Sequence, residues 1–189
     1  MSAIVSVNVG RPRQVEWHGR TVTTAIWKAP VRGRVLVEGI NLAGDDQADR
    51  RVHGGDTKAV YAYAAEDYAW WEGELGEPVP PGTFGDNLTL SGVDLRALAV
   101  GERWRAGTAV LRVSEPRFPC FKLGVRMGDA AFVDRFGAAR RFGSYFAIER
   151  PGMVGAGDAV ERLDTPEERW TLGEWIAAYE DNAPEGLTR

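Results

Sequence analysis

Short runs of β-branched and apolar residues, broken by glycine, proline, asparagine and aspartate, fill the first two thirds of this 189-residue chain. Runs of this kind are typical of β-strands, and the residues between them are typical of turns. The predicted strands are residues 3–9, 21–28, 34–38, 59–63, 108–114 and 145–148. Many short strands with glycine corners, in a chain with 23 glycines, favour a mainly β fold with some α and a closed or nearly closed β-barrel.

Two helices are predicted in the body of the chain. Residues 65–75 place Tyr68, Trp71 and Leu75 on one helical face, and Gly76 can end that helix. Residues 129–136 are predicted to form a second, shorter helix.

A third helix is predicted in the C-terminal tail. Thr165 has the position of an N-cap, Pro166 that of the first helical residue, and Glu168 completes a capping box. The apolar stripe beyond it consists of Leu172, Trp175, Ile176 and Tyr179. Such a stripe favours packing on the barrel over binding a partner. We therefore expect a barrel domain over residues 1–164 and a helical tail over residues 165–189.

Composition narrows the class of protein. The chain has 44% hydrophobic and 26% charged residues, which is typical of a globular domain. A net charge of −4 argues against binding nucleic-acid polymers or anionic membranes. One cysteine allows no disulfide within the chain, and we find no signal peptide and no apolar run long enough to span a bilayer. The expectation is a cytoplasmic protein, with an oligomer left open.

The single cysteine, Cys120, lies in a segment that favours a reactive thiolate. A lone cysteine is most often a small buried apolar residue. Here Pro119 precedes it, and Arg117, Lys122 and Arg126 are close in sequence. If a turn or helix begins at Pro119, these cations can lie near the sulfur and favour its charged form.

A second candidate segment, residues 49–61, combines glycines with cations and a histidine. Gly54 and Gly55 leave room for a ligand against the backbone, and Arg51 and Lys58 suit phosphate recognition. His53 could supply a hydrogen bond or a proton. The alternative is a glycine hairpin with a hydrogen-bonded histidine.

A third candidate segment is a glycine-rich loop over residues 80–90 that leads into a strand. Its Asn87 offers a donor and an acceptor, which suits an amide-like ring edge, or it stabilises a turn.

Other familiar motifs fail. Residues 155–160 lack the third glycine of a dinucleotide fingerprint, and there is no Walker loop. Residues 45–49 lack EF-hand spacing and are expected to form a capped turn or to pair with Arg50 and Arg51. Two histidines and one cysteine do not suit a structural zinc site.

Together these segments resemble the MOSC domain, named for the C-terminal part of molybdenum cofactor sulfurase, and within it the bacterial YiiM-like branch. The resemblance spans roughly residues 3 to 163, and its motifs are DDQAD (45–49), RVHGG (51–55), KAVYAY (58–63), FGDNL (84–88), PRFPCFKL (116–123) and GAGD (155–158). It implies a β-barrel-based fold that binds the molybdenum cofactor. It also implies that Cys120 is the family cysteine, which either ligates molybdenum or carries sulfur as a persulfide.

By motif position, the resemblance implies a cofactor pocket lined by His53, Lys58, Asn87, Arg117 and Lys122. Chemistry then suggests the roles: cations for the cofactor phosphate, Asn87 for a pterin edge, and His53 for a proton or for a hydrogen bond to a group that holds the cofactor. The chain departs from the family pattern at Asp86, where glutamate is usual, so that a shorter carboxylate needs a shifted backbone or a water. It also has Ala64 where proline is common, and a tail of one predicted helix instead of three.

The resemblance implies three functions. The first is a molybdenum-cofactor reductase of N-hydroxylated small molecules, with Cys120 as the metal ligand and an external redox protein as electron donor. The second is a sulfur carrier that receives sulfur on Cys120 from a pyridoxal-phosphate-dependent desulfurase. The third is a non-catalytic module that binds the cofactor.

Overall fold

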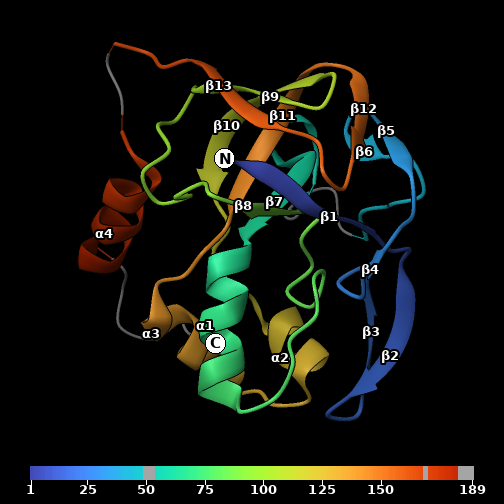
Figure 1. Ribbon diagram of the computed structural model, residues 1–189. Coiled ribbons are helices and arrows are strands. Elements are labelled where there is room, and N and C mark those ends of the chain that lie inside the picture. Colours follow the sequence, from blue (N-terminus) through green and yellow to red (C-terminus); the bar gives the residue numbers. More distant parts are fainter. Residues whose placement is uncertain (49–53, 168–169, 183–189) are drawn as a thin grey trace.

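A single mixed sheet forms the frame of the molecule (Figure 1). The computed structural model describes residues 1–48, 54–167 and 170–182. Over these residues the sheet has eight strands in the order β13-β9-β10-β11-β7-β8-β1-β4, of which β7 and β8 pair in parallel and the others antiparallel. In that order the strands are Val160–Asp164, Arg103–Ala106, Ala109–Pro116, Ser144–Arg150, Val60–Ala64, Leu88–Ser91, Ala3–Val9 and Ala29–Pro30.

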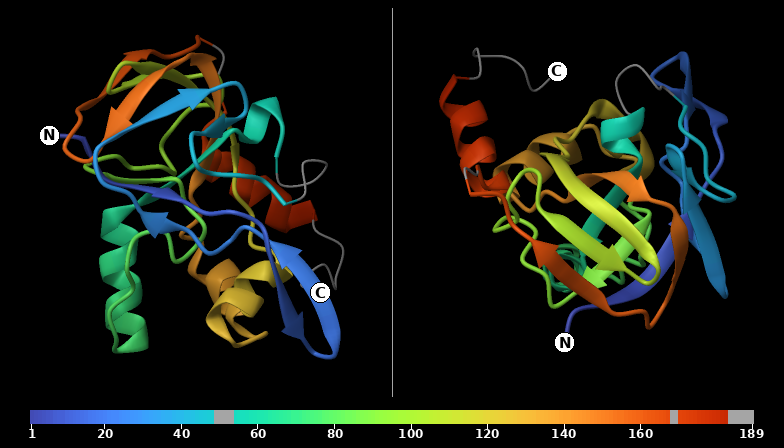
Figure 2. Two further views of the ribbon diagram at one scale, coloured as in Figure 1. Left: turned by 90° about the vertical axis from the view of Figure 1, so that its right-hand side faces the viewer. Right: turned by 90° about the horizontal axis from the view of Figure 1, so that it is seen from above.

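Two smaller sheets flank this frame (Figure 2). One joins β12 (Gly152–Gly155), β5 (Arg34–Glu38) and β6 (Asn41–Leu42). The other is the hairpin of β2 (Arg13–Trp17) and β3 (Arg20–Thr24). The predicted strand over residues 21–28 therefore ends early, because beyond Thr24 the chain has no strand to pair with.

The closed β-barrel expected from the sequence is not confirmed. In the described residues the main sheet remains open from β13 to β4, although an isolated bridge joins Ala3 of β1 to Ala159, next to β13. Two features of the edge strands explain why the sheet does not close: β4 has only two residues, and four of the five residues of β13 are exposed.

The helices cover one end of the sheet. They are α1 (Ala65–Leu75), α2 (Phe121–Met127), α3 (Phe132–Ala139) and α4 (Leu172–Asn182), with a short 3-10 turn η1 at Asp56–Lys58. The predicted bounds of α1 are confirmed, and Gly76 ends it in the left-handed conformation at φ 69°. The second predicted helix is displaced by three residues, because the Asp129 side chain accepts the amide of Ala131 in a turn before α3.

The predicted start of the tail helix at Thr165 is wrong. The Thr165 hydroxyl donates instead to the buried carboxylate of Glu102, 3.0 Å away. The helix begins six residues later, where Thr171 and Glu174 form the reciprocal hydrogen bonds of a capping box. Both threonines precede a glutamate by three residues, so the local pattern alone could not choose between them. The division of the chain at residue 164 stays a prediction.

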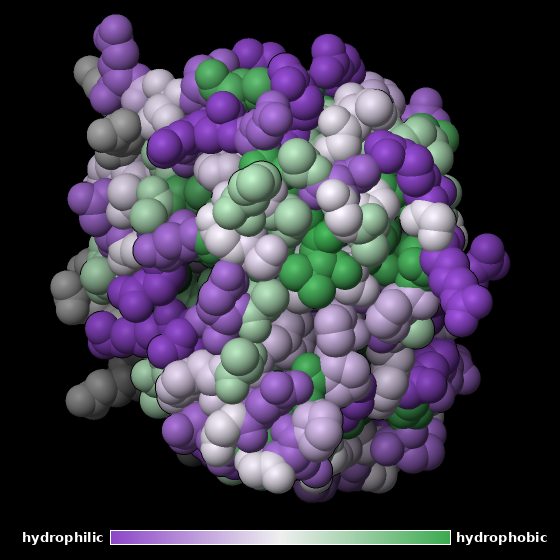
Figure 3. Space-filling view, viewed as in Figure 1, coloured by the Kyte–Doolittle hydropathy of each residue, from purple (hydrophilic) through white to green (hydrophobic). Residues whose placement is uncertain are grey.

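Two groups of buried side chains hold these parts together. An aliphatic core fills the space between the sheets, and an aromatic core lies under α1, α2 and α3. Residues of the aromatic core include Tyr63, Tyr68, Trp71, Phe84, Phe132 and Phe136. The face seen in Figure 3 is largely hydrophilic, with hydrophobic residues gathered near its middle. The site described next lies where the aromatic core meets the sheet.

Candidate functional site

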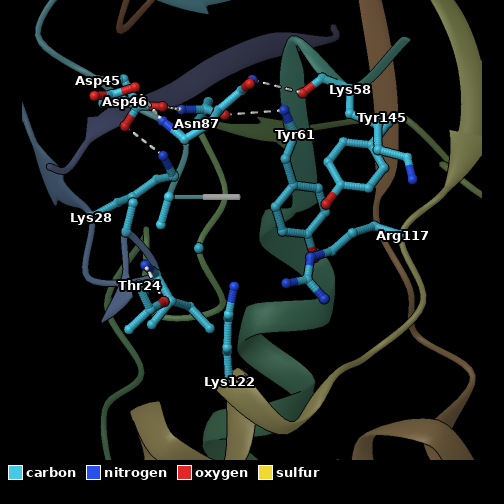
Figure 4. A pocket seen from close by; sticks show the side chains of 15 residues that line it. Thr24, Lys28, Asp45, Asp46, Lys58, Tyr61, Asn87, Arg117, Lys122 and Tyr145 are labelled. Carbon is cyan, nitrogen blue, oxygen red and sulfur yellow. Dashed lines mark hydrogen bonds and ion pairs between the residues drawn. The ribbon is translucent and has the colours of Figure 1, made fainter. Parts of the chain in front are cut away.

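An open cavity lies between the loop after β3, strand β7 and helix α2 (Figure 4). Segments far apart in the sequence supply its wall, including the end of β10 and strand β11. The lining residues are Thr24, Ala25, Ile26, Lys28, Asp45, Asp46, Gln47, Ala48, Lys58, Tyr61, Gly85, Asn87, Arg117, Lys122 and Tyr145. Four of the predicted cofactor-binding residues are among them: Lys58, Asn87, Arg117 and Lys122.

A buried ion pair between Lys28 and Asp45 forms one side of the cavity. The two side chains are 8% and 2% exposed. Asp45 also accepts the amide of Gly10 at 2.7 Å and the side-chain amide of Asn87 at 2.9 Å. Burial lowers the pKa of Lys28, and the attraction of Asp45 only partly opposes this shift. Lys28 is a partner of Asp45 that the sequence did not indicate. Arg50 and Arg51 lie outside the described residues, so the pairing expected of them stays a prediction.

Asn87 is bound mainly to the protein itself. Its side-chain oxygen accepts the Tyr61 amide at 3.1 Å, and its side-chain nitrogen donates to Asp45 and to the carbonyl of Asn8. Both amide hydrogens are thereby used, so only the second lone pair of the oxygen remains for a ligand. The main role of the Asn87 side chain in this structure is to join β7, β1 and the turn at Asp45 by hydrogen bonds.

Asp86, beside Asn87, is held by direct hydrogen bonds from the protein. Its fully buried carboxylate accepts hydrogen bonds from the Tyr68 hydroxyl, the Gly82 amide, the Asn8 side chain and the Thr89 hydroxyl. Four groups of the protein thus bind the shorter carboxylate directly, and whether the backbone is shifted relative to the family stays a prediction.

Arg117 and Lys122 bring positive charge to the cavity. The Arg117 guanidinium is buried and lies 5.2 Å from the centre of the Tyr61 ring. Burial opposes its charge, but Tyr145, Cys120 and Tyr61 together raise the pKa of Arg117. The Lys122 side chain rises from α2 into the same space (Figure 4). Lys58 instead pairs with Glu115 at 3.4 Å.

Cys120 lies just outside the cavity lining. It is partly buried, immediately precedes α2, and its carbonyl accepts the amide of Leu123. Its side chain is close enough to Arg117 for a hydrogen bond to contribute to the raised pKa of that arginine. The next residue, Phe121, is 51% exposed. The structure thus places one of the three expected cations directly beside the thiol.

The other predicted site residues fall into two groups. Arg126 is not part of the cavity lining and contacts Thr83 and the ring of Trp27. Gly54 and Gly55 are likewise not lining residues; Gly55 adopts φ 89° and donates its amide to the side-chain oxygen of Gln47. Arg51 and His53 lie outside the described residues.

The predicted site residues did not include the cavity residues Lys28, Tyr61 and Tyr145, although Tyr61 stood in the second candidate segment. Lys28 stood at the end of a predicted strand, and each tyrosine stood within another predicted strand. The local pattern around these residues therefore indicated β-structure and not a site. In the parts of the chain that the structure describes, no group of three or more His, Cys, Asp or Glu residues could hold a metal ion. The helices of those parts are too short or too polar to cross a membrane.

Several known proteins are similar to this chain in sequence. A model of the MOSC domain matches residues 49–161. The uncharacterized protein YflK of Bacillus subtilis is 36% identical over 166 residues, which cover 88% of this chain and 75% of that protein. Protein YiiM of Escherichia coli is 32% identical over 142 residues, covering 73% of this chain and 63% of YiiM. A protein named reductase from Gibberella moniliformis is 30% identical over 174 residues, covering 89% of this chain but 30% of that longer protein.

Solved structures agree with the sequence relatives. YiiM from Geobacillus stearothermophilus superposes with a TM-score of 0.78 at 28% identity, covering 100% of this chain and 88% of that one. YiiM from Escherichia coli gives a TM-score of 0.70 at 25% identity, covering 94% of this chain and 76% of that one.

Proposed function

The chain belongs to the MOSC domain family, and on that premise we propose that it binds a molybdenum–pterin cofactor and reduces N-hydroxylated compounds such as amidoximes or hydroxylaminopurines. The observation that carries the proposal is the cavity next to Cys120, into which Arg117 and Lys122 bring positive charge. The name of the Gibberella relative supports reductase chemistry.

The residues present fit such a cofactor. Several polar and charged side chains converge on the cavity, as at many small-molecule sites. Arg117 and Lys122 would hold the phosphate of the pterin group, since a guanidinium can donate two parallel hydrogen bonds and an ammonium adds charge. The free lone pair of Asn87 and the buried hydroxyl of Tyr61 remain for polar atoms of the ligand.

Cys120 would bind the metal through its sulfur. A thiolate is a soft ligand, which suits a metal already held by sulfur atoms. Arg117, beside the thiol, stabilises the thiolate by charge. When bound, the cofactor would supply the two-electron chemistry, with electrons from an external redox protein.

The test is the metal content of protein made in a host that synthesises the cofactor. We expect molybdenum and pterin in the wild type, less molybdenum in Cys120→Ala, and less of both in Lys122→Gln. Arg135→Gln, which removes an exposed cation of α3, is the control and should retain both. Equal molybdenum in the wild type and Cys120→Ala would refute ligation by this thiol.

A second function has one observation in its favour. Cys120 is partly exposed and is not part of the cavity lining, so another protein could reach its sulfur. This geometry suits a carrier that takes sulfur from a pyridoxal-phosphate-dependent desulfurase. Mass spectrometry after incubation with such an enzyme and cysteine should then show one added sulfur atom on Cys120, and no addition on Cys120→Ser.

A further inference from the structure

Tyr61 lines the cavity with a buried hydroxyl that has no partner. The residue is 3% exposed, and its hydroxyl finds no hydrogen-bond partner among the described residues. More than about nine in ten buried polar groups in proteins do have one, because an unpaired donor costs free energy. The unpaired hydroxyl of Tyr61 therefore calls for a physical reason.

Neighbouring tyrosines show that the surroundings can satisfy such groups. The Tyr63 hydroxyl donates to the carbonyl of Arg141 at 2.8 Å and accepts the Trp71 side chain at 3.0 Å. The Tyr68 hydroxyl donates to Asp86 and accepts the amide of Phe84. Neither residue lines the cavity, whereas Tyr61 does. Of these three buried tyrosines, the unpaired hydroxyl thus belongs to the one whose side chain lines the cavity.

The Tyr61 ring cannot easily turn away to find another partner. It packs 5.5 Å from the Tyr145 ring and 5.2 Å from the Arg117 guanidinium. Gly143 lies against the edge of the Tyr61 ring: a β-carbon added at Gly143 would come within 2.4 Å of a ring carbon. Three neighbours therefore fix the phenol in place before any ligand binds.

The charges around Tyr61 indicate which kind of ligand atom its hydroxyl would contact. Arg117 lies beside both Tyr61 and Cys120, so an oxygen with negative charge is favoured at this end of the cavity. Burial raises the pKa of Tyr61 well above its usual value, so the phenol keeps its hydrogen at neutral pH.

We propose that Tyr61 is a ligand-contacting residue, whose hydroxyl donates a hydrogen bond to a negatively polarised oxygen of the molecule bound beside Arg117. The inference rests on the proposed function, which supplies two sources for that oxygen. One is the N-hydroxyl group of the substrate, and the other is the cofactor.

Tyr61→Phe tests the contact in protein made in a cofactor-competent host, and Tyr63→Phe is the matched control on the same strand. The two readouts are molybdenum content and the rate of benzamidoxime reduction with a chemical electron donor. If the oxygen belongs to the substrate, Tyr61→Phe keeps its molybdenum and loses kcat/KM by roughly tenfold to a hundredfold. If it belongs to the cofactor, molybdenum content falls as well. Wild-type values of both quantities in Tyr61→Phe would overturn the inference.

Urea unfolding of the cofactor-free proteins separates this inference from the proposed function. Tyr61→Phe removes no hydrogen bond to the protein and should unfold at the wild-type urea concentration or above it. Tyr63→Phe breaks two hydrogen bonds and should unfold at a lower concentration. A wild type without molybdenum or activity would refute the proposed function alone. A Tyr61→Phe variant as destabilised as Tyr63→Phe would refute the contact, because the hydroxyl would then have a partner in the protein.

Discussion

At the scale of single residues, a few buried polar groups hold together the segments at and next to the cavity. Asp45 accepts hydrogen bonds from the turn after β1, from Lys28 and from Asn87, and so joins three segments. Asp86 does the same for β1, α1 and β8. Each carboxylate has several donors around it, and removing it leaves those donors unpaired away from water.

Asp45→Ala should lower the free energy of unfolding by about 3–5 kcal/mol, because it leaves the Lys28 ammonium buried without its counter-ion. Urea denaturation measures the loss. The double variant Lys28→Met/Asp45→Ala removes the stranded charge and should lose less stability than the two single changes added together. Additive losses in this cycle would contradict a buried, coupled ion pair.

Asp86→Glu, which restores the usual residue of the family, should destabilise this chain by about 1–3 kcal/mol, because the added methylene must enter a space already closed around the carboxylate. Thermal unfolding measures the effect. Asp134→Glu, at an exposed position of α3, is the control and should change stability by less than about 0.5 kcal/mol. Equal melting temperatures for Asp86→Glu and the wild type would show that the space can expand.

At the scale of elements, the ends of helices follow from contacts that the local pattern leaves undecided. Gly76 ends α1 where the sequence predicts, because a left-handed residue is required directly after the apolar stripe. The start of α4 depends instead on Glu102, which takes the Thr165 hydroxyl and leaves Thr171 to cap the helix.

Thr171→Ala should therefore cost about 1 kcal/mol and speed hydrogen exchange of the amides in the first turn of α4. Thr165→Ala removes the hydrogen bond to Glu102 but no cap, so exchange in α4 should stay as in the wild type. Faster hydrogen exchange in α4 for Thr165→Ala would contradict this result and would support the helix start at Thr165 that the sequence predicted.

At the scale of the whole molecule, polar tyrosines line an aromatic core instead of pointing to solvent. Burial raises the pKa of Tyr61, Tyr63, Tyr68 and Tyr145 above the usual value of 10. In the folded protein these phenols hold their protons at a pH where the unfolded chain releases them. Their contribution to stability is therefore complete below pH 10 and is lost as the pH rises through their folded-state pKa values.

An alkaline titration should show this coupling directly. Absorbance at about 295 nm follows phenolate formation, and circular dichroism follows unfolding. We expect these four tyrosines to ionise in the same pH range in which the protein unfolds, since their pKa values are raised by burial. Ionisation of all the tyrosines near pH 10 with native circular dichroism would contradict the buried phenols.

The local sequence pattern was enough to predict several elements of the fold and the family of this protein. The spacing of apolar residues, and the glycine, proline and polar residues between the apolar runs, predicted β1, β5 and α1 with the bounds that the structure shows. The spaced motifs identified the MOSC domain family, which the family match confirms. These features depend on residues close together in the chain, so the order of amino acids alone carries them.

Tertiary structure decided the rest, because it depends on contacts between residues far apart. The sheet stays open because its last strands are too short or too exposed to pair along their length. Asn87 meets Asp45 across 42 positions, and Asn8 meets Asp86 across 78. No short window of sequence shows that these partners use up the hydrogens of Asn87 while the hydroxyl of Tyr61 is left for a ligand.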